Sequence, residues 1–176
     1  MKNIEKLFAS CPNDSCLADD TVELQINIDG LPIFKSSSMQ LRPLLGSLKG
    51  CSIKSLFTIG IYAGNSKLLD TSVFLEDFVS ELRQLQTLGF DLNGRHFTVK
   101  IHSFVCDAPA RAMLKNIKAH SGYHSCERCT QTGLYCGKVI FPEVDAPLKN
   151  NVAFDEMRDA DHHHGPSPLW IKYWSS

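Results

Sequence analysis

The chain has 176 residues, of which 43% are hydrophobic and 21% are charged. These are values of an ordinary globular domain, so they exclude an intrinsically disordered chain and allow a buried core. The 18 basic and 19 acidic residues leave a net charge of −1, which excludes a strongly basic module that binds DNA by phosphate neutralisation alone.

The first predicted elements are two strands joined by a turn. Residues 1–20 show no clear period and are expected to form a short helix or a loose tail. From Val22 to Asp29, apolar and polar residues alternate, which is the period of a strand with one apolar face. Asp29 and Gly30 form a common turn dipeptide, so residues 31–37 are predicted to return as a second strand.

The next two segments differ in clarity. Residues 37–50 are interrupted by Pro43 and Gly46, and they fit a short apolar helix or a loop. Residues 56–64 are rich in β-branched and aromatic residues and predict a third strand.

The clearest helix follows, capped at its start by Asp70, Thr71 or Ser72 and ended by Gly89. One apolar stripe, at spacings of four, four and three, is formed by Phe74, Phe78, Leu82 and Leu85.

A fourth strand over residues 96–106 and a short helix over residues 110–118 complete a predicted core over residues 21–118. A strand, a helix and a parallel strand normally form a right-handed crossover, which can bring the fourth strand beside the first. The order strand, strand, strand, helix, strand, helix is ribonuclease-H-like. The predicted fold class is therefore α/β, with a mixed sheet and a small C-terminal segment containing cysteines and histidines.

Two acids follow strands of this core, Asp29 after the first and Asp107 after the fourth. If these strands are neighbours, both carboxylates lie at one rim of the sheet. Such a pair suits a divalent cation, which takes oxygen ligands and activates water or a hydroxyl group. Each acid also has a local interpretation, Asp29 as a turn residue and Asp107 as a helix cap. Their equivalent positions favour a nucleic-acid-cutting site.

Cysteines and histidines gather in residues 119–148, which precede a His-rich and aromatic tail over residues 149–176. Cys126 and Cys129 have the spacing of a knuckle that holds a structural zinc ion. The alternatives are reduced surface thiols, or a redox pair, which the absence of a thioredoxin-like context disfavours. The open candidates for the other zinc ligands are His120, His124, Cys136 and the run from His162 to His164.

Six segments resemble, in this order, transposase-derived proteins similar to the transposases of CACTA-type (En/Spm-like) DNA transposons. They extend over roughly residues 20–170 and read LQINIDGLPIFKSSSMQL, IGIYAGNSK, FLEDFVSEL, FVCDAPARAMLKNIKAHSGYHSCERC, VIFPEVDAPL and HHHGPSPL. The string around CDAPAR followed by GYHSCERC is the most specific of them.

The resemblance implies a ribonuclease-H-like domain whose DDE/D triad binds two Mg²⁺ or Mn²⁺ ions and cuts and joins DNA. By that resemblance Asp29 is the first catalytic acid and Asp107 the second. It also implies a nuclear protein with DNA as partner, and self-association or a full-length transposase as a further one. The zinc ligands that the residues and the resemblance favour are Cys126, Cys129, His120, His163 and His164.

The chain departs from the family pattern at the third acid of the triad, because no Asp or Glu follows Asp161. The expectation is a truncated copy that is inactive by itself. The alternative is a domesticated, zinc-stabilised module that binds DNA or protein without catalysis. No apolar run is long enough for a bilayer and no secretion signal opens the chain, so an intracellular protein with reduced cysteines and no membrane partner is expected.

Overall fold

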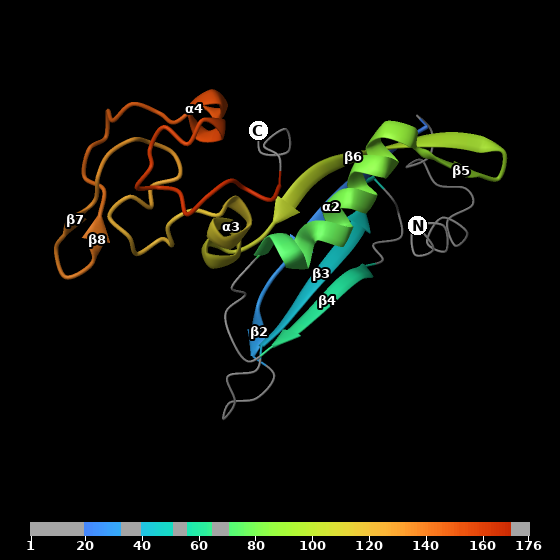
Figure 1. Cartoon of the computed structure of the whole chain (residues 1–176), viewed down its shortest axis with the longest axis horizontal. Coiled ribbons are helices and arrows are strands. Elements are labelled where there is room, and N and C mark those ends of the chain that lie inside the picture. Colours follow the sequence, from blue (N-terminus) through green and yellow to red (C-terminus); the bar gives the residue numbers. More distant parts are fainter. Residues whose placement is uncertain (1–19, 33–39, 51–55, 65–70, 170–176) are drawn as a thin grey trace. The chain divides into compact units, whose positions relative to one another are not determined.

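The computed structural model describes residues 20–32, 40–50, 56–64 and 71–169 (Figure 1). The chain divides into two compact units, Met1–Cys106 and Asp107–Ser176. The predicted N-terminal tail, up to residue 19, and the aromatic end of the C-terminal tail, from residue 170, lie outside the described residues.

The first unit is a mixed sheet with one long helix. Its strands run in the order β2-β3-β1-β6-β5, and β4 pairs with the other edge of β3. The pairs β1–β3, β3–β4 and β5–β6 are antiparallel, whereas β1 and β6 are parallel. The elements are β1 (Thr21–Ile28), β2 (Leu31–Pro32), β3 (Gln40–Leu48), β4 (Phe57–Gly64), α2 (Thr71–Leu88), β5 (Phe90–Leu92) and β6 (Arg95–Val105).

The predicted α/β class with a mixed sheet is confirmed, and so are the strand over 56–64, the long helix and the strand over 96–106. After α2 and β5 the chain enters β6, which lies beside β1 and runs parallel to it. The first strand and the fourth predicted strand are therefore neighbours.

The predicted turn at Asp29 and Gly30 is wrong. Ile28 is opposite Leu44, and Leu31, three residues on, is opposite Leu41, so the register along β3 does not change. β1 and β2 are two pieces of one hairpin arm, and the chain reverses between Pro32 and Gln40. Asp-Gly permits a tight turn but does not impose one, and here the pairing on both sides carries the chain straight through.

The segment over residues 37–50, predicted as a short helix or loop, contains the strand β3, which is the true return strand. Two strand-breaking residues are accommodated by neighbours. Pro43 lies beside a register shift between Leu44 and Leu45, where an irregular ladder tolerates a missing N–H group. Gly46 is covered by the ring of Phe57, which a Cβ atom would meet at 2.5 Å.

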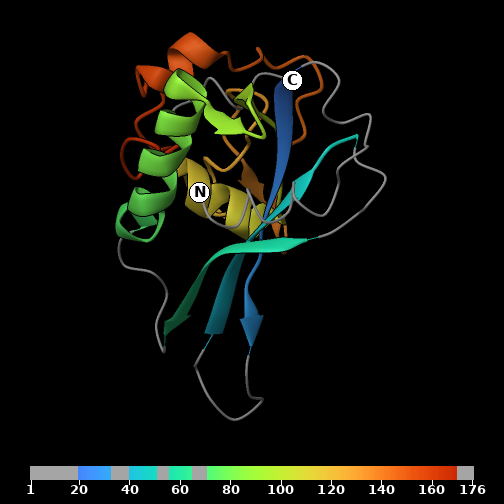
Figure 2. The ribbon, with the colours of Figure 1, turned by 90° about the vertical axis from the view of Figure 1, so that its right-hand side faces the viewer.

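The core of this unit lies between one face of the sheet and α2, which runs along that face (Figure 2). Every second residue of β1 is buried, while the alternate residues Glu23, Gln25 and Asn27 are half-buried on the opposite face. The helix ends as predicted at Gly89, whose φ is 65° and whose N–H group donates to the carbonyl oxygen of Leu85. The buried side chains of β1 and α2 are Val22, Leu24, Ile26, Ile28, Leu75, Phe78, Leu82 and Leu85.

The second unit is mostly irregular. Its elements are α3 (Ala108–Lys115), β7 (Leu134–Tyr135), β8 (Val139–Ile140) and α4 (Asn151–Asp155). The predicted helix over 110–118 therefore starts two residues earlier and ends three residues sooner, because Asn116 takes the left-handed conformation at its C-cap (φ 54°, ψ 47°). No helix among the described residues is both long and apolar enough to cross a membrane.

Candidate functional site

Asp29 lies in the interruption between β1 and β2 and is exposed. Its Oδ1 atom accepts a hydrogen bond from the N–H group of Gly30 at 2.7 Å. Two residues earlier, the Nδ2 atom of Asn27 donates to the carbonyl oxygen of Val105 at 3.0 Å, which ties β1 to the last residue of β6. The Asp29 side chain therefore accepts a hydrogen bond from the adjacent backbone, although the predicted hairpin turn does not form there.

Asp107 is the N-cap of α3, so the local interpretation of this acid is confirmed. Its backbone is extended (φ −69°, ψ 171°), and its Oδ1 atom accepts from the N–H group of Ala110 at 2.7 Å. The carboxylate is exposed at the positive end of the helix, which favours a negative charge there. Along the chain, Asp107 follows Val105 by two residues.

Each acid thus spends one oxygen on a neighbouring backbone N–H group, and its Oδ2 atom has no hydrogen bond within the described part of the chain. An exposed carboxylate oxygen of this kind can bind Mg²⁺ or Mn²⁺. The described residues contain no group of three or more His, Cys, Asp or Glu side chains that could hold a metal ion.

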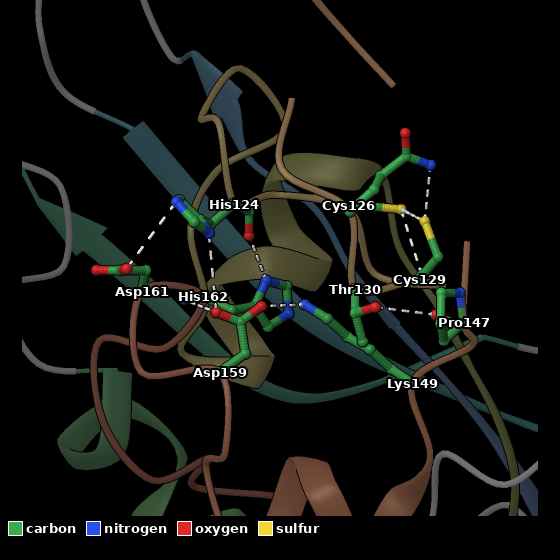
Figure 3. Close-up of polar contacts among 10 residues, drawn as sticks. His124, Cys126, Cys129, Thr130, Pro147, Lys149, Asp159, Asp161 and His162 are labelled. Carbon is green, nitrogen blue, oxygen red and sulfur yellow. Dashed lines mark hydrogen bonds and ion pairs between the residues drawn. The ribbon is translucent and has the colours of Figure 1, made fainter. Parts of the chain in front are cut away.

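Cys126 and Cys129 do lie together, in the turn after α3 (Figure 3). Their Sγ atoms are 3.1 Å apart, and the N–H group of Cys129 donates to the Sγ atom of Cys126 at 3.4 Å. Cys129 is buried, at 8% exposure, while Cys126 is only half-buried. Sequence reasoning identified this pair but missed Gln131, whose Nε2 atom donates to the Sγ atom of Cys129 at 3.0 Å.

The predicted histidine ligands do not join this pair. His120 is exposed. His163 forms a β-bridge with Ile117 and packs its ring against Phe154 at 4.6 Å. His164 is exposed, and its N–H group donates to the carbonyl oxygen of Asn116. In the described part of the chain the two thiols have no third ligand, so these residues do not fit a closed tetrahedral zinc site.

His162 is the buried member of the histidine run, and its importance is not readable from the sequence. Its side chain is completely buried, its Nδ1 atom is hydrogen-bonded to the carbonyl oxygen of His124, and its Nε2 atom is buried without a partner (Figure 3). The backbone N–H group of His162 donates to the carboxylate of Asp159, which also pairs with Lys149 at 3.0 Å. Burial lowers the pKa of His162 and thereby favours its neutral form.

Glu127, inside the Cys-x-x-Cys turn, joins the turn to α3. Its carboxylate accepts from the Nε atom of Arg111 and from the Nζ atom of Lys115, each at 2.9 Å. Burial raises the pKa of Glu127, but the hydrogen bond and charge of Lys115, followed by those of Arg111, outweigh it and bring the pKa below its ordinary value. The two basic side chains of α3 are thus engaged with this carboxylate.

No protein-family model matches the chain, and a search of curated proteins found no match. The functional argument therefore rests on the motifs and on the geometry of the two units.

Proposed function

We propose that this chain carries the first two acids of a metal-dependent site for DNA strand cleavage and transfer, of the ribonuclease-H-like DDE type. The supporting observation is the parallel pairing of β1 with β6, which ends with Asn27 opposite Val105. Asp29 and Asp107 each follow one of these residues by two positions. Both acids therefore follow the carboxyl ends of two neighbouring parallel strands.

The strand arrangement gives a second line of support. In the strand order β4-β3-β1-β6, each of the first three strands is antiparallel to its neighbour. The last strand, β6, follows the helix α2 in the chain and is parallel to β1. This agrees with the ribonuclease-H-like order that the sequence predicts and with the resemblance to CACTA-type transposases.

Mg²⁺ or Mn²⁺ would be held by the free oxygens of Asp29 and Asp107, and when bound it would polarise a phosphate and activate the attacking hydroxyl group. A two-metal site needs further carboxylates to hold the second ion. The chain by itself is therefore expected to bind one ion weakly and not to cleave. DNA affinity has to come from local contacts or from a partner, since the net charge is −1.

Metal binding tests the proposal directly. Asp29→Asn and Asp107→Asn each remove the charge but keep a side-chain oxygen for the N–H groups of Gly30 and Ala110. We expect each variant to weaken Mn²⁺ binding at least about tenfold, measured by electron paramagnetic resonance, with unchanged unfolding curves. Asp145→Asn, at an exposed acid elsewhere, is the matched control. Equal Mn²⁺ affinity in all three variants would contradict a shared site.

Strand cleavage is tested with Mn²⁺ and DNA substrates that carry candidate transposon ends. We expect no product from the chain alone. Cleavage that Asp29→Asn abolishes would show that the chain holds a complete site, which would overturn the expected inactivity but not the role of the acid.

A second candidate is a binding module without catalysis, which the exposed apolar side chains of the second unit favour. Isolated exposed apolar residues are common, but several on one small unit suggest a surface for a partner or a second copy. Sedimentation velocity would detect self-association, and Leu134→Ser should abolish it if these side chains form the contact. They are Tyr123, Leu134, Tyr135, Val144, Leu148 and Val152, each at least 51% exposed.

A further inference from the structure

We propose that Cys126 and Cys129 form a reversible dithiol–disulfide pair, in which Cys126 reacts first with an incoming disulfide and Cys129 closes the intramolecular bond. This assignment does not depend on the proposed DNA chemistry. It replaces the structural zinc knuckle that the spacing alone predicts.

The geometry is close to that of a disulfide. The Sγ atoms are 3.1 Å apart, and bond formation requires an approach of about 1 Å to a length of roughly 2.05 Å. Two thiolates on one tetrahedral zinc ion at about 2.3 Å each would lie roughly 3.8 Å apart, with two further donors beside them. The described part of the chain offers no such donors at this pair.

The surrounding backbone holds Cys129 in place. Cys129 forms a β-bridge with Leu148, and backbone hydrogen bonds on either side join Thr130 to Pro147 and Arg128 to Lys149. Cys126 lies in the turn outside this bridge. The approach of the two sulfur atoms therefore needs a movement of the turn and not of the bridged segment.

Gln131 supplies the donor that a reactive thiol needs. Its Oε1 atom accepts from the N–H group of Glu143 at 2.9 Å, and its Nε2 atom donates to the carbonyl oxygen of Glu143 at 2.9 Å. These two hydrogen bonds to Glu143 fix the orientation of the amide, so an N–H group of Gln131 faces the Sγ atom of Cys129. A local donor thus replaces the thioredoxin-like context.

The two cysteines differ in exposure and in hydrogen bonding. Cys126 is partly exposed and can meet a small disulfide, whereas Cys129 is buried and accepts a hydrogen bond from Gln131. This division assigns the first reaction to Cys126 and the second, over a short distance, to Cys129.

The oxidant is a low-molecular-weight disulfide such as oxidised glutathione. The Cys126 thiolate attacks one of its sulfur atoms, the S–S bond breaks, and one small thiolate leaves and takes up the proton that Cys126 gave up. The Cys129 thiolate then attacks the Sγ atom of Cys126, and the mixed disulfide breaks. The second small thiolate leaves with the proton of Cys129. Two protein thiols are oxidised, and one small disulfide is reduced to two thiols.

The test uses the full chain in glutathione buffers of defined ratio, with acid quenching, alkylation and peptide mass mapping. We expect a Cys126–Cys129 disulfide. Cys129→Ser should instead accumulate glutathione on Cys126, and Cys126→Ser should react with glutathione at Cys129 at least tenfold more slowly. Cys136→Ser, at an exposed cysteine of the same unit, is the control and should leave the disulfide unchanged.

Gln131→Leu provides a variant that keeps both thiols. Without the donor, the mixed disulfide at Cys126 should persist several-fold longer while the second step slows. The proposal would be overturned by equal glutathione labelling of both cysteines without a disulfide between them. It would also be overturned by one tightly bound zinc per chain, seen by native mass spectrometry, that protects the pair and is lost in Cys126→Ser.

Discussion

Single polar side chains hold much of the second unit together, because its irregular segments bury few apolar residues. Glu127 is the clearest case: its side chain is 21% exposed, and it accepts hydrogen bonds from two residues one turn apart on α3, Arg111 and Lys115. The carboxylate therefore pairs with two basic neighbours and ties the turn that bears Cys126 and Cys129 to α3.

Glu127→Gln is expected to lower the free energy of unfolding of the second unit by about 1–3 kcal/mol, because Arg111 and Lys115 lose the charged acceptor that they share. Urea denaturation measures the change. Glu143→Gln makes the same substitution at an exposed side chain of this unit and should cost less than about 0.5 kcal/mol. Equal effects of the two substitutions would show that the ion pairs contribute little.

His162 should make the second unit sensitive to acid. Burial lowers the pKa of His162, and burial with the charge of His162 lowers that of His163, so unfolding takes up protons below the ordinary histidine pKa of 6.5. The free energy of unfolding should therefore be at its maximum above pH 7. As the pH drops under 6.5 it should decrease by at most about 1.4 kcal/mol per pH unit for each histidine. Carboxylates of lowered pKa, such as Asp159, add a further loss below about pH 4.

Hydrogen exchange at the N–H group of Lys118, which donates to the carbonyl oxygen of His162, measures this loss after correction for intrinsic rates. His162→Gln should reduce the slope against pH, and His120→Gln, at an exposed position, should not. An unchanged slope in His162→Gln would assign the acid sensitivity to other groups.

Among the elements, those fixed by local pattern were predicted from the sequence and those fixed by distant partners were not. The alternation in β1 and the apolar stripe of α2 are properties of neighbouring residues. β3 was missed because Pro43 and Gly46 are tolerated only through the register shift and the ring of Phe57 in the adjacent strand. The same holds at the candidate sites, where both acids and both thiols were identified.

Gln131 and His162 were missed there, because burial and hydrogen-bond partners give them their roles. The amide of Gln131 is oriented by Glu143, twelve residues away, and the carbonyl oxygen that meets His162 belongs to His124, thirty-eight residues away. Neither separation leaves a period or a motif in the sequence.

The cap of α3 gives a prediction for that helix. Asp107→Ala should cost about 1 kcal/mol of unfolding free energy, because the N–H group of Ala110 loses its acceptor. Asp107→Asn should be nearly neutral, because asparagine caps helices as well as aspartate does. Thermal unfolding of the two variants separates the capping role from any role in metal binding. A destabilised Asp107→Asn would mean that the charge itself stabilises the helix.

The pairing of β3 with β4 gives a second prediction. Gly46→Ala should destabilise the first unit by about 1–3 kcal/mol, because the added methyl group would meet the ring of Phe57 at 2.5 Å. Gly60→Ala, in the adjacent strand, adds a methyl group with nothing within 4 Å and serves as control. Chemical denaturation should give a clearly lower free energy of unfolding for Gly46→Ala than for Gly60→Ala. The reverse ranking would show that the ring moves aside at little cost.

Over the whole molecule, the division into two units separates a regular sheet from a loop-rich region held by polar contacts. The boundary falls between Cys106 and Asp107, so the strand β6 belongs to one unit and the helix that follows it to the other. Different interactions maintain the two units. Apolar burial maintains the first, whereas ion pairs and, separately, a buried histidine maintain the second.

This difference predicts that substitutions act on one unit at a time. Gly46→Ala should raise hydrogen exchange in residues 71–105 and leave residues 107–169 unchanged, and Glu127→Gln should do the opposite. Exchange measured peptide by peptide checks both. Equal increases in both units from either substitution would indicate a single cooperative unit.

One consequence follows from the uninterrupted register of β1 and β2. Asp29 is fixed by the pairs on either side, Ile28 with Leu44 and Leu31 with Leu41. Insertions or deletions between Pro32 and Gln40 should therefore leave the position of this carboxylate unchanged.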